Sequence, residues 1–521
     1  MREFCMIAEI GRWHLAVSCG LCLLTAAPVV HAASGNTVVN TEAGAVQGVT
    51  QRAVVSFKGI PYAAPPVGPL RWREPQPAPP WSGTRPANAF GKSCMQRPGV
   101  PVEEGGASGA LSEDCLTLNV WTPAPTPPAK RPVIVWIHGG GYAQGAGSAP
   151  FYDGAAMARK GAVFVTFNYR LGPLGFFAHP ALDAGNPGGP YNFGMLDQVA
   201  ALKWIQANIA GFGGDPANVT IMGESAGGKS VLWHFASPLS RGLFHKGIAQ
   251  SVYILPDTPL DKAREASNRI ASAVGLDGAQ ASLAEMRKIA PERFFGITDK
   301  QALLGPVGIV GDTMLPRPIA ETFQAGEEAR LPLIIGNTSD DASVLSAFGL
   351  SPDGILDRLG AAGFALKLLY PGVPAEQIPR QALRDAVFTL NSRWTADRHT
   401  QRAPTWRYYF DYVAAKDKAK WPHGVPHGAE IVYFLDTLDS RYAQRDRDYA
   451  RKVSGYMLAF ARTGKPAFAA SPEWQDHRRL RDRALTFGPD TIEQRNNFMK
   501  ARLNALMGTT KIVDALFRSA N

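Results

Sequence analysis

A serine stands inside a glycine frame of the kind that exposes a nucleophile. The segment is Gly223-Glu224-Ser225-Ala226-Gly227, which fits G-x-S-x-G, and it follows an apolar run. The frame alone is weak support, because a chain with 53 glycines in 521 residues produces such pairs by chance. Between a strand and a helix, however, the small flanking glycines let the serine take a strained backbone and point its oxygen at a substrate. Ser225 is therefore the predicted nucleophile.

A phosphate-binding loop, G-x-x-x-x-G-K-[ST], matches the same segment at Gly223, Gly228, Lys229 and Ser230. This motif also lies between a strand and a helix, so the two hypotheses conflict. A nucleotide hydrolase would need an apolar strand ending in an aspartate that holds Mg²⁺, and the sequence offers no convincing one. A P-loop nucleotide hydrolase is therefore the weaker hypothesis.

A glycine run precedes the serine in the chain and directly follows a candidate core strand. It reads His138-Gly139-Gly140-Gly141-Tyr142. Backbone amides in such a loop can converge on an oxyanion beside the nucleophile. A flexible turn would explain the glycines but not their place after a core strand. We expect the oxyanion to meet the amides of Gly140, Gly141 and Ala226.

Short apolar runs alternate with amphipathic stretches from Pro132 onward. The candidate strands are apolar enough to be buried on both faces and cover residues 132–138, 162–169, 219–223, 331–337 and 406–413. Between them, residues 195–209 carry apolar side chains at helical spacing, namely Leu196, Val199, Leu202, Ile205 and Ile209. This order is typical of βαβ units. The predicted fold class is α/β, with a large, mostly parallel central sheet flanked by helices.

The motifs and their order resemble the type-B carboxylesterase family, which includes the cholinesterases and bacterial p-nitrobenzyl-type esterases. The matching segments begin with FKGIPYAAPPVGPLRWREPQP (57–77) and SEDCLTLNVW (112–121). They continue through HGGGY, GNPGGPYNFGMLDQVAALKWIQANIAGFGGDPANVTIMGESAGG and PHGAEIVYF to FARTGKP and PEW. So many ordered matches are specific and span most of the chain. The resemblance implies an α/β-hydrolase fold and a serine carboxylesterase that requires no metal or organic cofactor.

The acid of a catalytic triad follows the serine in α/β hydrolases. The resemblance places it in GNTSDDAS, where Asp341 takes the position of the family's usual glutamate and Ala342 that of a glycine. Aspartate is one methylene shorter, yet it can accept the imidazole N–H if its loop approaches more closely. Asp340 is the alternative acid.

The histidine of the triad comes last in the chain. The resemblance implies His427 in PHGAEIVYF, with His423 as the alternative. It also suggests that Ser251 hydrogen-bonds the acid. In this arrangement His427 would take the proton of Ser225 while Asp341 holds the useful tautomer of the imidazole.

The first residues have the features of an export signal. Basic residues precede an apolar stretch at 15–30, and VHAAS then predicts cleavage after Ala32. The stretch is short for a transmembrane helix, so stable membrane insertion is not expected. Cys19 lacks the usual leucine of a lipid-attachment site. We expect residues 1–32 to be a signal peptide, residues 33–521 to form a single domain, and the protein to be periplasmic or secreted.

Cysteine usage agrees with export. Of the five cysteines, Cys94 and Cys115 lie beyond the leader. An even pair in an exported protein favours one disulfide, although two free thiols are the alternative. The resemblance implies the same pairing.

The net charge of +10 is concentrated in arginines near the C-terminus. Acidic residues are interleaved with them and no aromatic nucleic-acid motif accompanies them, so solvated helix faces are expected and a nucleic-acid partner is not. A small-molecule ester, bulky or carboxylated and of xenobiotic or natural-product origin, is the expected substrate. A non-catalytic binding module of the same fold is the alternative, but such modules typically lack the nucleophile.

Overall fold

The computed structural model describes residues 37–508, apart from 124–128, 185–187, 254–256, 298–305, 349–351, 353–360 and 470. The leader expected at residues 1–32 lies outside the described residues. All described residues belong to one compact unit, Ser34–Asn521.

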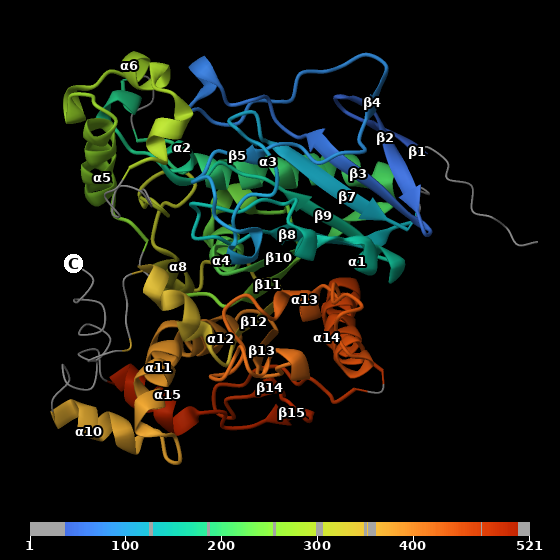
Figure 1. Cartoon of the computed structure of the whole chain (residues 1–521), viewed down its shortest axis with the longest axis vertical. Coiled ribbons are helices and arrows are strands. Elements are labelled where there is room, and N and C mark those ends of the chain that lie inside the picture. The colour runs from blue at the N-terminus through green and yellow to red at the C-terminus, as the bar shows by residue number, and fades with distance from the viewer. Residues whose placement is uncertain are drawn as a thin grey trace, which may run out of the picture. The chain divides into compact units, whose positions relative to one another are not determined.

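A large sheet runs through this unit (Figure 1). Its spatial order is β1 (Thr37–Thr41), β2 (Gly44–Gln51), β3 (Val54–Pro61), β7 (Thr117–Thr122), β9 (Val163–Phe167), β8 (Arg131–Ile137), β10 (Gly214–Glu224), β11 (Lys246–Gln250), β12 (Leu333–Thr338), β13 (Thr405–Phe410), β14 (Ala484–Phe487) and β15 (Ile492–Arg495), with β4 (Thr84–Pro86) beside β2. The strands from β9 to β14 in this order pair in parallel, and the pairs outside them are antiparallel apart from β2 with β4. The predicted α/β class with a mostly parallel sheet is confirmed.

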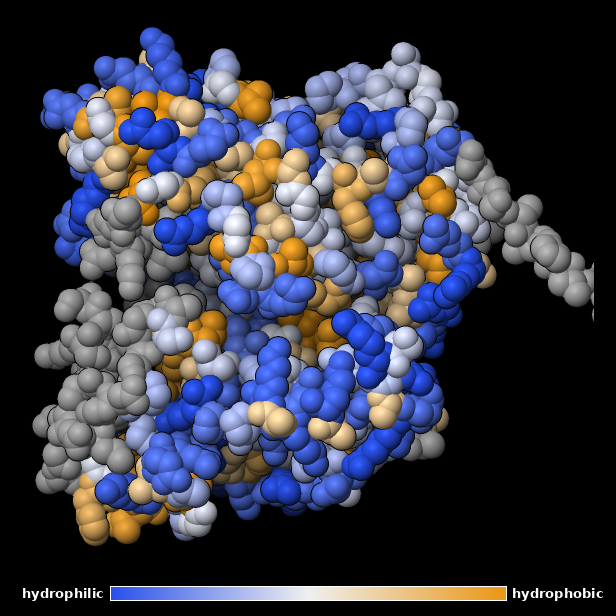
Figure 2. Space-filling model, in the orientation of Figure 1, coloured by the Kyte–Doolittle hydropathy of each residue, from blue (hydrophilic) through white to orange (hydrophobic). Residues whose placement is uncertain are grey.

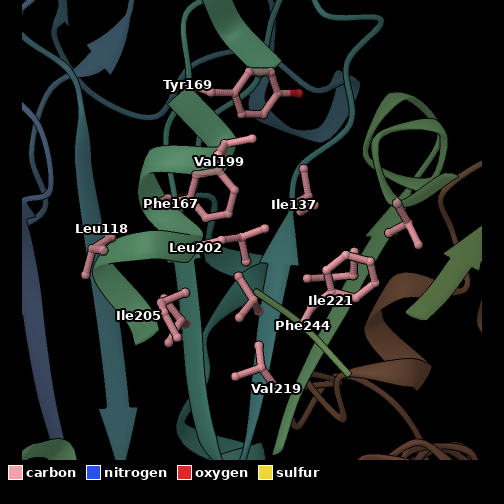
Figure 3. Close-up of a cluster of buried hydrophobic side chains, with 14 of the residues drawn as sticks. Leu118, Ile137, Phe167, Tyr169, Val199, Leu202, Ile205, Val219, Ile221 and Phe244 are labelled. Atoms are coloured by element: carbon pink, nitrogen blue, oxygen red, sulfur yellow. The ribbon is translucent and has the colours of Figure 1, made fainter. Parts of the chain in front are cut away.

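Both faces of the central strands are buried. In β8, Val133, Val135 and Ile137 pack with residues of α3 (Phe193–Asn208) and α4 (Ala226–Ala236) in one core cluster, part of which Figure 3 shows. The alternate residues Ile134 and Trp136 pack with α14 (Gln444–Thr463) in a second cluster. Burial of both faces explains the continuous apolar runs.

The predicted elements agree with the observed ones apart from their ends. The strands expected at 132–138, 162–169, 219–223, 331–337 and 406–413 are β8, β9, β10, β12 and β13, and the helix expected at 195–209 is α3. Strand β11 carries no clear apolar pattern, because its sequence KGIAQ begins with lysine and ends with glutamine. It is nevertheless fully paired between β10 and β12.

The other α-helices of the described residues are α1 (Ala155–Arg159), α2 (Gly172–Gly175), α5 (Leu260–Ala273), α6 (Leu283–Lys288), α8 (Ile319–Ala325), α10 (Ala361–Leu368), α11 (Ile378–Arg384), α12 (Leu390–His399), α13 (Ile431–Phe434) and α15 (Lys500–Gly508). The short strands β5 (Ser93–Cys94) and β6 (Leu111–Ser112) pair outside the main sheet. The expected disulfide between Cys94 and Cys115 is present and closes a loop of 21 residues. Such a loop stabilises the fold by about 3 kcal/mol in the chain-entropy model.

The basic C-terminal region is a solvated surface, as the interleaved acids predicted. The side chains of Arg441 and Arg445 are 80% and 70% exposed, and each lies beside an aspartate. Figure 2 shows hydrophilic residues over this region around α14. Within the described ranges, no helix combines the length and the apolar character that a membrane crossing requires.

Candidate active site

Ser225 lies in a sharp turn between β10 and α4. Its backbone has φ 57° and ψ −120°, a conformation that costs roughly 1–3 kcal/mol and is held by its surroundings. The amide of Ser225 donates to Gln250 O at the end of β11, at 2.9 Å. A Cβ at Gly227 would lie 2.0 Å from Ile137 O, so only glycine fits there. The turn therefore needs its glycine frame, and it presents the hydroxyl at the carboxyl end of the parallel strands.

Asp341 and His427 are joined by a hydrogen bond. Nδ1 of His427 lies 2.8 Å from Oδ1 of Asp341, whose side chain is fully buried. The other oxygen, Oδ2, accepts from Thr338 N at 2.8 Å and from Ser251 Oγ at 3.0 Å. The bond from Ser251 is the one that the family resemblance suggested. These contacts fix the carboxylate, which in turn favours the tautomer with the proton on Nδ1 and leaves Nε2 as a base.

The alternative acid and histidine are placed elsewhere. Asp340 accepts from Arg380 through Nε at 2.5 Å and Nη2 at 2.7 Å. His423 is exposed. The structure therefore brings Asp341, and not its neighbour, to His427.

Glu224, immediately before the nucleophile, is a site residue that sequence reasoning missed. Its Oε1 lies 3.1 Å from Nε2 of His427, and the residue is 4% exposed. No hydrogen bond joins Ser225 Oγ to His427 within the part of the chain that the structure describes. Catalytic hydrogen bonds are often long or poorly aligned in free enzymes and tighten when substrate binds. Glu224 thus lies at the Nε2 edge of the imidazole, which is the edge that would take the proton of Ser225.

Charge around the imidazole shifts its protonation. Burial by itself lowers the pKa of His427, but nearby carboxylates outweigh burial and raise the pKa above its ordinary value; they belong to Glu224, Asp341 and Glu430. Burial raises the pKa of Glu224, whereas the charge of the His427 imidazolium acts to lower it. The site therefore stabilises the imidazolium, which is the form that histidine takes when it accepts a proton from serine.

Replacement of Glu224 by glutamine is expected to move the acidic limb of the pH profile of kcat/KM downward by about one pH unit. Only neutral His427 can act as a base, and loss of the Glu224 charge lowers the imidazole pKa, so the base form persists to lower pH. The measurement is ester hydrolysis from about pH 5 to about pH 10. Glu265→Gln, which removes the same charge from an exposed position on α5, should leave the limb in place. A limb that stays fixed in Glu224→Gln would contradict the assigned coupling.

The glycine loop passes directly beside the nucleophile. A Cβ at Gly139 would lie 3.2 Å from Ser225 Cβ, which shows how closely the loop approaches. Gly140 has φ +100°, a turn conformation that favours glycine, and its carbonyl accepts from Gln144 N at 3.1 Å.

The predicted oxyanion donors have no protein acceptor. Within the described ranges, the amides of Gly140, Gly141 and Ala226 donate to no other residue. The loop is tied to α4 because Tyr142 Oη donates to Ala226 O at 2.5 Å. Amides held in this way can stabilise an oxygen anion that forms on a carbonyl attacked by Ser225.

The chain is similar in sequence and in fold to known esterases. A sequence profile described as carboxylesterase family matches residues 35–360 and 375–506. A fumonisin B1 esterase of Sphingopyxis macrogoltabida is 34% identical over 485 residues, which cover 89% of each chain. A para-nitrobenzyl esterase of Bacillus subtilis is 34% identical over 483 residues, 88% of this chain and 96% of its own. A solved PNB esterase structure has a TM-score of 0.76 and 31% identity, covering 91% of this chain and 100% of its own.

Proposed function

The chain belongs to the carboxylesterase family, has the α/β-hydrolase fold and is a carboxylic ester hydrolase, and we propose that it works through an acyl-enzyme on Ser225. The observation that carries this proposal is the hydrogen bond of 2.8 Å between Asp341 and His427, beside a serine held in a strained turn. A nucleophile, a base and a group that orients the base are the parts that such chemistry requires.

The proposed reaction has two halves. Ser225 Oγ attacks the ester carbonyl while His427 Nε2 takes its proton, and Asp341 stabilises the imidazolium. The carbonyl oxygen becomes an anion that receives hydrogen bonds from the amides of the glycine loop and of Ala226. Each such donor contributes about 2.7–4 kcal/mol to the stability of the transition state. The imidazolium protonates the departing alcohol, and water then attacks the acyl-enzyme with the same base.

Covalent trapping tests the proposal. A phosphate triester with a p-nitrophenyl leaving group should inactivate the enzyme, release one p-nitrophenolate per chain and add a dialkyl phosphate to the peptide that contains Ser225. Peptide mass spectrometry identifies the modified residue. Modification of another serine with equal loss of activity, or inactivation without any covalent adduct, would contradict the assignment.

We also propose that the substrate is a bulky or carboxylated ester of xenobiotic or natural-product origin. The support is the net charge of +10, which attracts anions, together with similarity to an enzyme named for fumonisin B1. Added salt should then lower kcat/KM for an anionic ester more than for a neutral one, because salt screens charge. Equal responses of the two esters would contradict an electrostatic preference.

We propose that the protein is exported to the periplasm or beyond. The leader of residues 1–32 and the disulfide between Cys94 and Cys115 support this, because disulfides persist mainly in oxidising compartments. N-terminal sequencing of protein from the periplasm or medium of a bacterial host should begin at Ala33. Full-length protein found only in the cytoplasm would contradict export.

Neither alternative from the sequence is retained. A non-catalytic binding module is excluded because the chain is a carboxylic ester hydrolase. The nucleotide-hydrolase hypothesis rested on the phosphate-loop match at Lys229 and Ser230. The family assignment gives that segment a different role.

A further inference from the structure

Lys229 is a charged residue close to the nucleophile that the proposed mechanism does not use. It lies one helical turn after Ser225, and its amide donates to Ser225 O at 2.8 Å. Side chains on a helix lean toward its N-terminus, so that of Lys229 leans toward the turn that carries Ser225. The Lys229 side chain is 6% exposed, as little as Ser225 itself. A cation is thus held one helical turn from the nucleophile, and its side chain is about as buried as that residue.

The described neighbours of the Lys229 ammonium include one carboxylate and two aromatic rings. Oδ1 of Asp257 lies 3.2 Å from its Nζ, and the rings of Trp233 and Tyr253 each have their centroid 5.5 Å away. Asp257 is itself fixed, because its Oδ1 accepts from Trp233 Nε1 at 3.1 Å and its Oδ2 from Ile319 N at 2.7 Å. The ammonium is therefore held in one place by a preorganised set of neighbours.

A structural role alone is a weak explanation for this lysine. Burial of an ion pair carries a desolvation penalty, and apolar residues of similar volume often serve a fold equally well. The histidine side of the site is rich in carboxylates, at Glu224, Asp341 and Glu430. A negatively charged substrate would be repelled there unless its charge met a cation, and Lys229 supplies a cation next to Ser225.

The position of Lys229 indicates which part of the ester it meets. In the proposed mechanism the carbonyl oxygen points to the amides of the glycine loop and Ala226, and the alcohol oxygen points to His427, which protonates it. The acyl chain takes the remaining direction. Asp257, Trp233 and Tyr253, which lie near the Lys229 ammonium, belong neither to the glycine loop nor to the histidine segment.

We propose that the Lys229 ammonium binds a carboxylate on the acyl part of the substrate, so that the enzyme selects esters of dicarboxylic or polycarboxylic acids. This inference rests on the proposed role of Ser225. It assigns a specificity residue to the substrate class, with Asp257 as the residue that positions the ammonium and the two rings as walls that shield the charge pair from water.

The test compares matched esters. Monoethyl glutarate and ethyl pentanoate have the same carbon chain up to the last carbon, which is a carboxylate in the first and a methyl group in the second. The ratio of their kcat/KM values measures recognition of an acyl carboxylate. Lys229→Met should lower this ratio by about 10- to 100-fold, as expected for loss of a hydrogen bond to a charged group. Lys229→Arg should retain part of the ratio, because it retains the charge.

A matched control separates a local from a global effect of charge. Lys246 is also buried, and it lies at the first residue of β11, at the end of the strand opposite Gln250. Lys246→Met removes the same charge and should leave the ratio unchanged. A second pair, carboxymethyl butyrate and ethyl butyrate, carries the carboxylate on the alcohol side, and its ratio should change little in Lys229→Met.

Two results would overturn the inference. In the first, the glutarate ratio stays unchanged in Lys229→Met; in the second, the alcohol-side ratio falls as much as the acyl-side ratio. Lys229→Met leaves the Asp257 carboxylate buried without the charge of Lys229, which destabilises the fold. If this variant does not fold, the double variant Lys229→Met with Asp257→Asn, which removes both charges, is used to measure the same two ratios. Hydrolysis of ethyl pentanoate that survives Ser225→Ala would instead refute the proposed function.

Discussion

Replacement of Ser225 by alanine is expected to lower kcat for p-nitrophenyl acetate and butyrate by about 10⁴- to 10⁶-fold, with the fold retained. The hydroxyl is the proposed attacking atom, and the site offers no equivalent nucleophile in the strained turn. Alanine keeps the Cβ, and its backbone amide can donate the same hydrogen bond to Gln250 O, so the turn between β10 and α4 should persist. Residual turnover would come from the oxyanion amides and from binding alone.

The control for this variant is a buried serine on α4. Ser230 is fully buried, and its hydroxyl accepts from Gln198 Nε2 at 3.1 Å and lies 3.4 Å from Tyr142 Oη. Ser230→Ala therefore removes a hydroxyl from the helix that follows the turn, and it leaves the turn itself unchanged. Its kcat should stay within about tenfold of the unmodified enzyme, because packing changes reach the reaction only indirectly. Circular dichroism and thermal unfolding check that both variants fold. Comparable activity of Ser225→Ala and the unmodified enzyme would refute Ser225 as nucleophile.

Local sequence was enough to predict the turn that carries Ser225. The apolar run of β10, the glycines and the following helix are contiguous, so their geometry follows from short-range sterics. The glycine loop after β8 is predictable for the same reason. Strand β11 was not, because its burial comes from neighbouring strands rather than from its own residues.

Charges that meet only in the folded chain could not be predicted. Glu224 and His427 are far apart in sequence, and nothing in the spacing shows that their side chains lie 3.1 Å apart. Glu224 occupies a position of the G-x-S-x-G motif that accepts any residue type, so the motif does not indicate a role for its carboxylate. The choice between the adjacent residues Asp340 and Asp341 also depended on tertiary structure, since Arg380 comes from a different element.

Asparagine at position 341 is expected to lower kcat by about 10⁴-fold, whereas asparagine at position 340 should leave turnover largely intact. The Asp341 carboxylate accepts from Nδ1 of His427 at 2.8 Å. An asparagine amide can donate to Nδ1 instead, which shifts the imidazole proton to Nε2. Nε2 then cannot take the proton of Ser225, even though every atom of the site stays close to its original place.

Asp340→Asn is the matched control, because it makes the same chemical change one residue away. Its expected effect is on stability, with a loss of about 1–3 kcal/mol from the weakened pairing with Arg380. Steady-state hydrolysis of p-nitrophenyl butyrate and thermal unfolding of both variants separate the two roles. If Asp340→Asn abolished turnover and Asp341→Asn preserved it, the acid would be Asp340, and the hydrogen bond between Asp341 and His427 would be structural. The expected pattern instead requires that the buried carboxylate beside the imidazole, and not the one held by Arg380, sets the tautomer that makes Ser225 reactive.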